Sequence, residues 1–167
     1  MIAALGVYRA EPVALVLLGV ALLAFLVVGT RLSVIDWRTH RLPDRLVLPS
    51  YPAAILLLGG AAAVAGEWHR MVGVLAGGAV LWTGFAILHV LNRRGLGFGD
   101  VKLAGLLGLY LGFVGWGALW WGPFFGVVLG GLWSMALIVT RRAGLRSSIA
   151  FGPFLIAGAA LALAVLR

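Results

Sequence analysis

The sequence predicts an all-α protein that crosses a membrane six times, and two observations carry this prediction. The 167-residue chain has a mean hydropathy of +1.11 and only 11% charged residues, far below the roughly 25% of soluble domains. Its apolar residues also gather into six segments separated by short connectors. Because so small a soluble protein could not bury this much apolar side chain, the excess is expected to face lipid.

The six expected helices follow the apolar runs, since a membrane span needs about 20 residues, with a range of about 17–25. The first run exceeds the roughly 7–15 apolar residues of a signal peptide, so it is read as a retained helix. No polar stretch is long enough for a separate soluble domain, so residues 1–167 are expected to form one membrane-embedded domain. The helices are expected over residues 12–35, 46–65, 71–91, 101–116, 118–140 and 149–166.

The basic residues predict the orientation. Three reside on one side: Arg9, Arg70 and Arg167. Ten reside on the other: Arg31, Arg38, Arg41, Arg45, Arg93, Arg94, Lys102, Arg141, Arg142 and Arg146. Because connectors rich in Lys and Arg remain in the cytoplasm, both termini are expected outside. Topology thus accounts for the net charge of +8, and nucleic-acid binding is not expected.

Several chemistries lack the residues they need. The chain has no cysteine, which excludes disulfides, thiolate catalysis and cysteine zinc sites. Its three histidines are scattered without an HExxH pair, so a zinc metalloprotease has no support. Its serines form no G-x-S-x-G motif. Glycines spaced by four, at 73–77, 108–112 and 126–130, are expected to let helices approach closely.

Three of the five acidic residues belong to the cytoplasmic side. The five are Glu11, Asp36, Asp44, Glu67 and Asp100. Asp36 directly follows the first apolar run and Asp100 directly precedes the fourth. A carboxylate at the membrane edge is energetically costly unless it has a charged partner or contacts water, so both aspartates are functional candidates. The structural alternatives are that Asp36 pairs with Arg31 or Arg38, and that Asp100 caps a helix. Asp44 is expected in a solvated turn.

Two carboxylates brought together from different helices predict an aspartic peptidase. One ionised carboxylate takes a proton from water, and a protonated one donates a hydrogen bond to the scissile carbonyl. Like charges at close range share one proton, so the pair titrates as a unit. The competing hypotheses are a small proton-coupled transporter, which uses membrane carboxylates as a proton path, and a non-catalytic assembly subunit of a secretion system.

Three motifs resemble the type IV prepilin peptidases, the GxGD class of membrane aspartic peptidases. A GxGD motif, Gly97-Phe98-Gly99-Asp100, continues into Val-Lys-Leu. A D-x6-P-D stretch begins at Asp36, and Ala-Phe-Gly-Pro-Phe-Leu occupies residues 150–155. The resemblance covers roughly residues 15–166. It implies that Asp36 and Asp100 are catalytic and that the chain cleaves pilin or pseudopilin precursors at the cytoplasmic face of the inner or plasma membrane.

The resemblance also implies a substrate form and a supporting role for other motif residues. The precursors carry a short basic leader before a hydrophobic helix, and the cut usually follows a glycine. Gly97 and Gly99 are expected to allow unusual backbone angles and close approach. Gly152 and Pro153 are expected to shape the wall of the site. Lys102 is expected to meet lipid phosphate or the surroundings of the other carboxylate, without a catalytic role.

The chain departs from the larger family members in one respect. Those members carry a cytoplasmic insert with two CxxC pairs that bind zinc, and they also methylate the new N-terminus. This cysteine-free chain has no such insert, so no metal or other cofactor is expected, and methyltransferase activity is argued against. The compact form resembles the minimal peptidases that serve Flp or tight-adherence pili.

Overall fold

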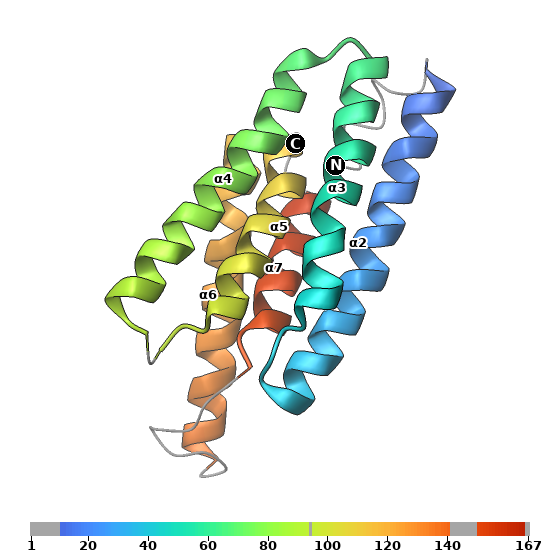
Figure 1. Ribbon diagram of the computed structural model, residues 1–167. Helices are drawn as coiled ribbons and strands as arrows, with labels where there is room; N and C mark the ends of the chain where they lie inside the picture. The colour runs from blue at the N-terminus through green and yellow to red at the C-terminus, as the bar shows by residue number, and fades with distance from the viewer. Residues whose placement is uncertain (1–10, 94, 141–149, 166–167) are drawn as a thin grey trace.

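The computed structural model describes residues 11–93, 95–140 and 150–165, and every regular element in these ranges is a helix. Successive helices run in opposite directions and form an elongated bundle (Figure 1). The all-α prediction is confirmed. The helices are α2 (Pro12–Thr39), α3 (Asp44–Val64), α4 (Trp68–Leu91), α5 (Phe98–Val114), α6 (Trp116–Val139) and α7 (Gly152–Val165).

Four of these helices, α2, α3, α4 and α6, are long and apolar enough to cross a membrane. Within the described residues, α7 is a shorter apolar helix and α5 has 17 residues. The six crossings therefore stay a prediction, as does the placement of the termini. The basic residues Arg9, Arg94, Arg141, Arg142, Arg146 and Arg167, which enter the charge argument, lie outside the described residues, as do the first residue expected in the sixth helix and the last, 149 and 166.

Two helix ends differ from the expected ones in a way that matters for the aspartates. Helix α2 continues to Thr39, so Asp36 lies inside its last turn and not beyond it. Helix α5 begins at Phe98, so Asp100 lies inside its first turn. The reason is physical: hydropathy marks the part of a helix suited to lipid, whereas backbone hydrogen bonding continues into polar residues at its ends.

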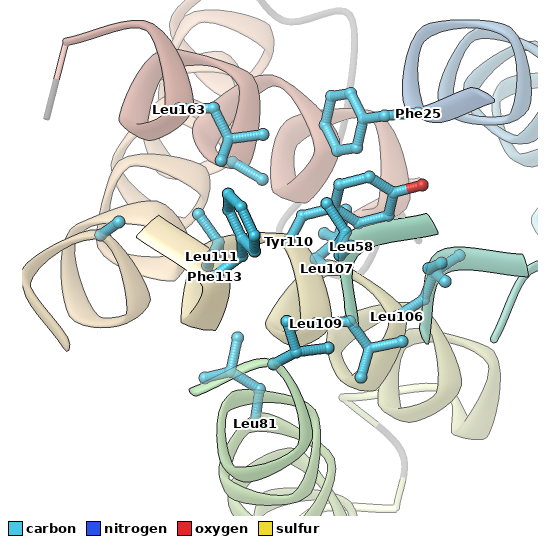
Figure 2. Close-up of a cluster of buried hydrophobic side chains, with 14 of the residues drawn as sticks. Phe25, Leu58, Leu81, Leu106, Leu107, Leu109, Tyr110, Leu111, Phe113 and Leu163 are labelled. Atoms are coloured by element: carbon cyan, nitrogen blue, oxygen red, sulfur yellow. The ribbon is translucent and has the colours of Figure 1, made fainter. Parts of the chain in front are cut away.

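Helix α5 is the central element of the bundle. From Val101 to Phe113 every residue except Lys102 is buried, and the helix contacts α3, α4, α6 and α7. Figure 2 shows this core, in which Phe25, Leu58, Leu81 and Leu163 from four other helices surround the side chains of α5. A helix that is apolar on all sides is expected in this position.

Glycines make the contact between α4 and α5. A Cβ atom added to Gly73 would lie 2.5 Å from the carbonyl oxygen of Gly112, and one added to Gly77 would lie 2.7 Å from the Gly112 Cα. Gly108 meets the backbone of Gly77 equally closely. No side chain fits between the two backbones, so the expected packing role of these glycines is confirmed.

The third glycine pair packs α6 against α7. A Cβ atom added to Gly126 would lie 3.0 Å from the Leu155 Cα, and one added to Gly130 would lie 3.3 Å from the ring of Phe151. The beginning of α7 is thereby held in the bundle beside α2, which it also contacts. This placement matters for the site, because α7 begins next to the end of α2 (Figure 1).

Replacing Gly77 with alanine is expected to destabilise the protein by about 1–3 kcal/mol, because an added methyl group forces two backbones apart. Thermal unfolding of the detergent-purified protein measures the effect. The matched control is Gly84→Ala on the same helix, where nothing lies within 4 Å of the added Cβ. That change is expected to be neutral or slightly stabilising. Equal unfolding temperatures of the two variants would contradict the packing role of Gly77.

Candidate active site

Asp36 is held at the beginning of α7. Its side chain is 5% exposed, and it is the one buried charged side chain among the described residues. The backbone N–H of Gly152 donates to Asp36 Oδ2 at 3.0 Å. The first N–H groups of a helix lack partners within the helix and attract negative charge. The carboxylate thus has a backbone partner, and the alternative in which it pairs with Arg31 or Arg38 is wrong.

Gly152 has no side chain because the carboxylate takes that space. A Cβ atom added to Gly152 would lie 2.7 Å from Asp36 Oδ2, closer than atoms in contact can approach. Pro153 follows in the first turn of α7, where the missing N–H removes no helical hydrogen bond. The two residues together begin α7 at the point where it meets Asp36.

Asp100 lies in the first turn of α5, and its side chain is half-buried. The N-cap residue is Gly97 and not Asp100, but the Asp100 carboxylate interacts with the backbone N–H of Gly97 from the first turn, so the expected contribution of Asp100 to capping is retained. The carboxylate lies over Gly97, since a Cβ added to that glycine would be 3.5 Å from Asp100 Oδ2. Negative charge in a first helical turn is favoured by the helix dipole.

The two aspartates line one open cavity of about 670 Å³. Its other walls are the turn between α2 and α3 (residues 40–43), Asp44 and Arg45, and the glycine segment (residues 97–99) with Lys102. The volume falls within the range of about 300–1,000 Å³ typical of ligand sites. Both carboxylates can therefore reach one bound molecule, and the open mouth admits water.

Neither motif glycine has an unusual backbone conformation, and close packing requires a glycine at position 99 only. Gly97 has φ −71° and ψ 148°, an extended conformation open to any residue, and Gly99 lies within α5. A Cβ added to Gly99 would lie 3.1 Å from the Leu42 Cβ, so this glycine lets the α2–α3 turn close over the glycine segment. Among the residues that line the cavity, the one with a positive φ, 50°, is His40 at the end of α2.

Asp44 and Lys102 form an ion pair, which the sequence did not predict for either residue. Lys102 Nζ donates to Asp44 Oδ1 at 2.7 Å. Asp44 is exposed, as expected of a solvated residue, but it begins α3 and does not lie in a turn. The two residues are 58 positions apart, and no local pattern could have joined them.

Two further residues support the glycine segment, and sequence reasoning assigned a role to neither. His89 Nδ1 donates to the carbonyl oxygen of Leu96 at 2.7 Å, and its ring centroid is 5.6 Å from that of Phe98. The hydroxyl of Tyr51 donates to the carbonyl oxygen of Lys102 at 2.6 Å. Within the ranges that the structure covers, no three His, Asp or Glu side chains gather as metal ligands would.

A model of the type IV leader peptidase family matches residues 20–165. The chain is 36% identical over 151 residues to a prepilin leader peptidase/N-methyltransferase of Burkholderia pseudomallei (strain 1026b), covering 87% of this chain and 47% of that protein. It is 33% identical over 139 residues to one of Escherichia coli (strain K12), covering 81% and 58%. It is also 34% identical over 127 residues to a prepilin leader peptidase/N-methyltransferase of Aeromonas salmonicida (strain A449), covering 74% of this chain and 42% of that protein.

The chain thus spans about half the length of the curated relatives it matches. No solved structure matches it significantly.

Gly152→Ala is expected to destabilise the protein by about 1–3 kcal/mol, because it displaces a buried carboxylate from its N–H donor. The cause can be isolated in the Asp36→Ala background, where the space next to residue 152 is empty and the same change should be nearly neutral. Thermal unfolding of the four proteins in detergent measures the coupling. Equal effects of Gly152→Ala in both backgrounds would show that the contact with Asp36 is not the cause.

Proposed function

The chain belongs to the type IV leader peptidase family, and from that premise we propose that it is a membrane aspartic endopeptidase that removes the leader from type IV pilin precursors. The observation that carries the proposal is the single open cavity lined by Asp36 and Asp100, which come from different helices. The relatives, which are named prepilin leader peptidases, support the same activity class.

The proposed chemistry needs only the two carboxylates and water. The pair shares one proton. The ionised carboxylate takes a proton from a water molecule, whose oxygen attacks the scissile carbonyl carbon, while the protonated carboxylate donates a hydrogen bond to the carbonyl oxygen. The tetrahedral intermediate then collapses, the C–N bond breaks, and the leaving amine takes a proton from the pair. The products are a leader with a new carboxylate and a pilin with a new amino group.

The membrane face of the site is part of the proposal. We propose six crossings, both termini outside, and the aspartates at the cytoplasmic border of the inner membrane. The distribution of charge supports this, because the aspartate end of the described bundle holds Arg31, Arg38, Arg41, Arg45, Arg93 and Lys102, and the opposite end holds Arg70. Basic residues collect on the cytoplasmic side. A peptide bond just before a transmembrane helix would meet the carboxylates at this depth.

The proposed substrates are pilin-like precursors, Flp or tight-adherence pilins among them. Such a precursor presents its leader in water and its hydrophobic helix in lipid, so its cleavage site lies at the membrane border. The names of the relatives include a second activity, that of an N-methyltransferase. We propose the peptidase activity for this chain, whose 167 residues include no cysteine, because the resemblance associates the second activity with members that carry CxxC pairs.

The distribution of buried charge favours hydrolysis over proton-coupled transport. A proton path would require ionisable side chains along the interior of the bundle. In the described residues the buried charge is confined to Asp36, in the last turn of α2, while the interior around α5 is apolar. The carboxylates are therefore suited to a reaction at one face.

Asp36→Asn and Asp100→Asn are each expected to lower precursor cleavage by about 10²- to 10⁴-fold, because each removes a proton-transfer group from the pair. The measurement is the intact mass of a pilin precursor coexpressed with the chain. Asp44→Asn is the control at the same rim and should retain detectable cleavage. Cleavage at the wild-type rate by either of the first two variants would refute the proposed mechanism.

The cysteine-free chain offers a direct test of orientation. A single cysteine at Thr39, near the aspartates, is expected to react with a membrane-impermeant maleimide only in inside-out vesicles. A cysteine at His69, at the opposite end of the bundle and also exposed, should react in intact spheroplasts. The reverse pattern would place the site on the outer face.

A further inference from the structure

Helix α3 holds α5 near its beginning through two contacts with Lys102. Asp44 accepts the hydrogen bond from Lys102 Nζ at 2.7 Å, and the Tyr51 hydroxyl donates to the Lys102 carbonyl at 2.6 Å. Asp44 and Tyr51 are seven residues apart, two helical turns, so both lie on one face of α3. Gly105 leaves the space that the Tyr51 hydroxyl occupies, since a Cβ there would collide with it. Lys102 is thus held through its side chain and its backbone.

The same ammonium group also contacts the glycine segment. Lys102 Nζ lies 5.0 Å from the centroid of the Phe98 ring, within the range of a cation–π interaction. Phe98 also contacts the ring of His89, whose hydrogen bond to Leu96 holds the chain that leads into the glycine segment. The ion pair therefore connects α3 to the glycine segment, which α4 holds through the separate contacts of His89.

The position of this pair relates it to both aspartates. Asp44 directly follows the α2–α3 turn, in which Leu42 contacts Gly99. Lys102 comes two residues after Asp100, and both lie near the beginning of α5. Asp36, at the other end of the turn, has a separate anchor on Gly152. The pair consequently controls how closely the α2–α3 turn approaches the segment that carries Asp100.

We propose that Asp44 and Lys102 are positioning residues, whose ion pair holds the α2–α3 turn on the glycine segment and so keeps Asp100 opposite Asp36. The inference rests on the proposed function, because it assigns these residues to the same two aspartates. Lys102 is not a catalytic residue in this arrangement, since its ammonium group is directed to Asp44. The pair is partly exposed, with side chains 20% and 55% accessible for Lys102 and Asp44, so its expected effect is on geometry more than on stability.

A disulfide between the turn and the glycine segment tests the geometry without any cleavage assay. The Cβ atoms of residues 42 and 99 would lie 3.1 Å apart, slightly less than the roughly 3.5–4.5 Å of a disulfide, so Leu42→Cys with Gly99→Cys should oxidise after a small outward shift of the turn. Adding Asp44→Asn is expected to slow cross-linking about two- to fivefold, the effect of losing a weak, partly exposed ion pair. The charge exchange Asp44→Lys with Lys102→Asp should restore most of the rate.

Arg45→Gln in the same cysteine pair is the matched control, because Arg45 lines the same cavity and forms no ion pair among the residues that the structure describes. It should leave the cross-linking rate unchanged. Equal rates with and without Asp44→Asn would overturn the inference, whether or not any precursor is cleaved. The inference would also be overturned if the charge exchange did not restore the cross-linking rate in a variant that unfolds at the wild-type temperature.

Cleavage kinetics in the cysteine-free background supply the second readout. Asp44→Asn and Lys102→Gln are each expected to lower kcat about three- to tenfold with KM within about twofold, and the charge exchange should recover kcat. An unchanged kcat in a variant that cross-links slowly would overturn the positioning role. Failure of the wild-type chain to cleave any precursor would instead overturn the proposed function, and the cross-linking result would still decide whether the pair sets the geometry.

Discussion

The direct backbone contact between α4 and α5 is the constraint on which the rest of the bundle depends. Gly73 and Gly77 on α4 face Gly108 and Gly112 on α5 with no room for a side chain on any of them. This contact allows α5 to be buried along almost its whole length while the other five described helices pack around it. The position of Asp100 follows, because α5 can begin at only one depth in the bundle once its glycines are engaged.

The two aspartates are held by different means, and both means use helix termini. Asp36 is buried on α2 and accepts an N–H from the first turn of α7, a position where free N–H groups favour an anion. Asp100 lies in the first turn of α5, two residues before Lys102, which α3 holds through Asp44 and Tyr51. The cavity is thus a composite of several helix ends, and substitutions far from either carboxylate can change the distance between them.

Much of this arrangement could be predicted, because hydropathy marks the helices of a membrane protein and successive connectors alternate between its two sides. The six apolar runs located the six described helices, and alternating connectors assigned Asp36, Asp44 and Asp100 to one end of the bundle. Helix ends were less predictable: α2 includes Asp36 and α5 includes Asp100, because polar residues extend a helix beyond its apolar part. The motif residues Gly99 and Gly152 were found, but the contacts that require them, with Leu42 and Asp36, belong to the folded chain.

The contacts that no sequence pattern could reveal are those between distant polar groups. The Asp44–Lys102 pair spans 58 positions and the Tyr51–Lys102 hydrogen bond spans 51. The partner of Asp36 is a backbone amide 116 positions away, and a backbone amide carries no signal in composition. The arginines next to Asp36 in sequence suggested a local ion pair, whereas burial against α7 provided the partner.

The central claim is that this chain by itself hydrolyses a peptide bond with the Asp36 and Asp100 pair. Its most direct test uses the purified chain in detergent, a purified pilin precursor and water labelled with oxygen-18. The account predicts two products whose masses sum to the precursor plus one water, with a single labelled oxygen in the new carboxylate of the leader. A folded wild-type chain that yields no product, or one that yields it equally well after both aspartates are replaced by asparagine, would contradict the account.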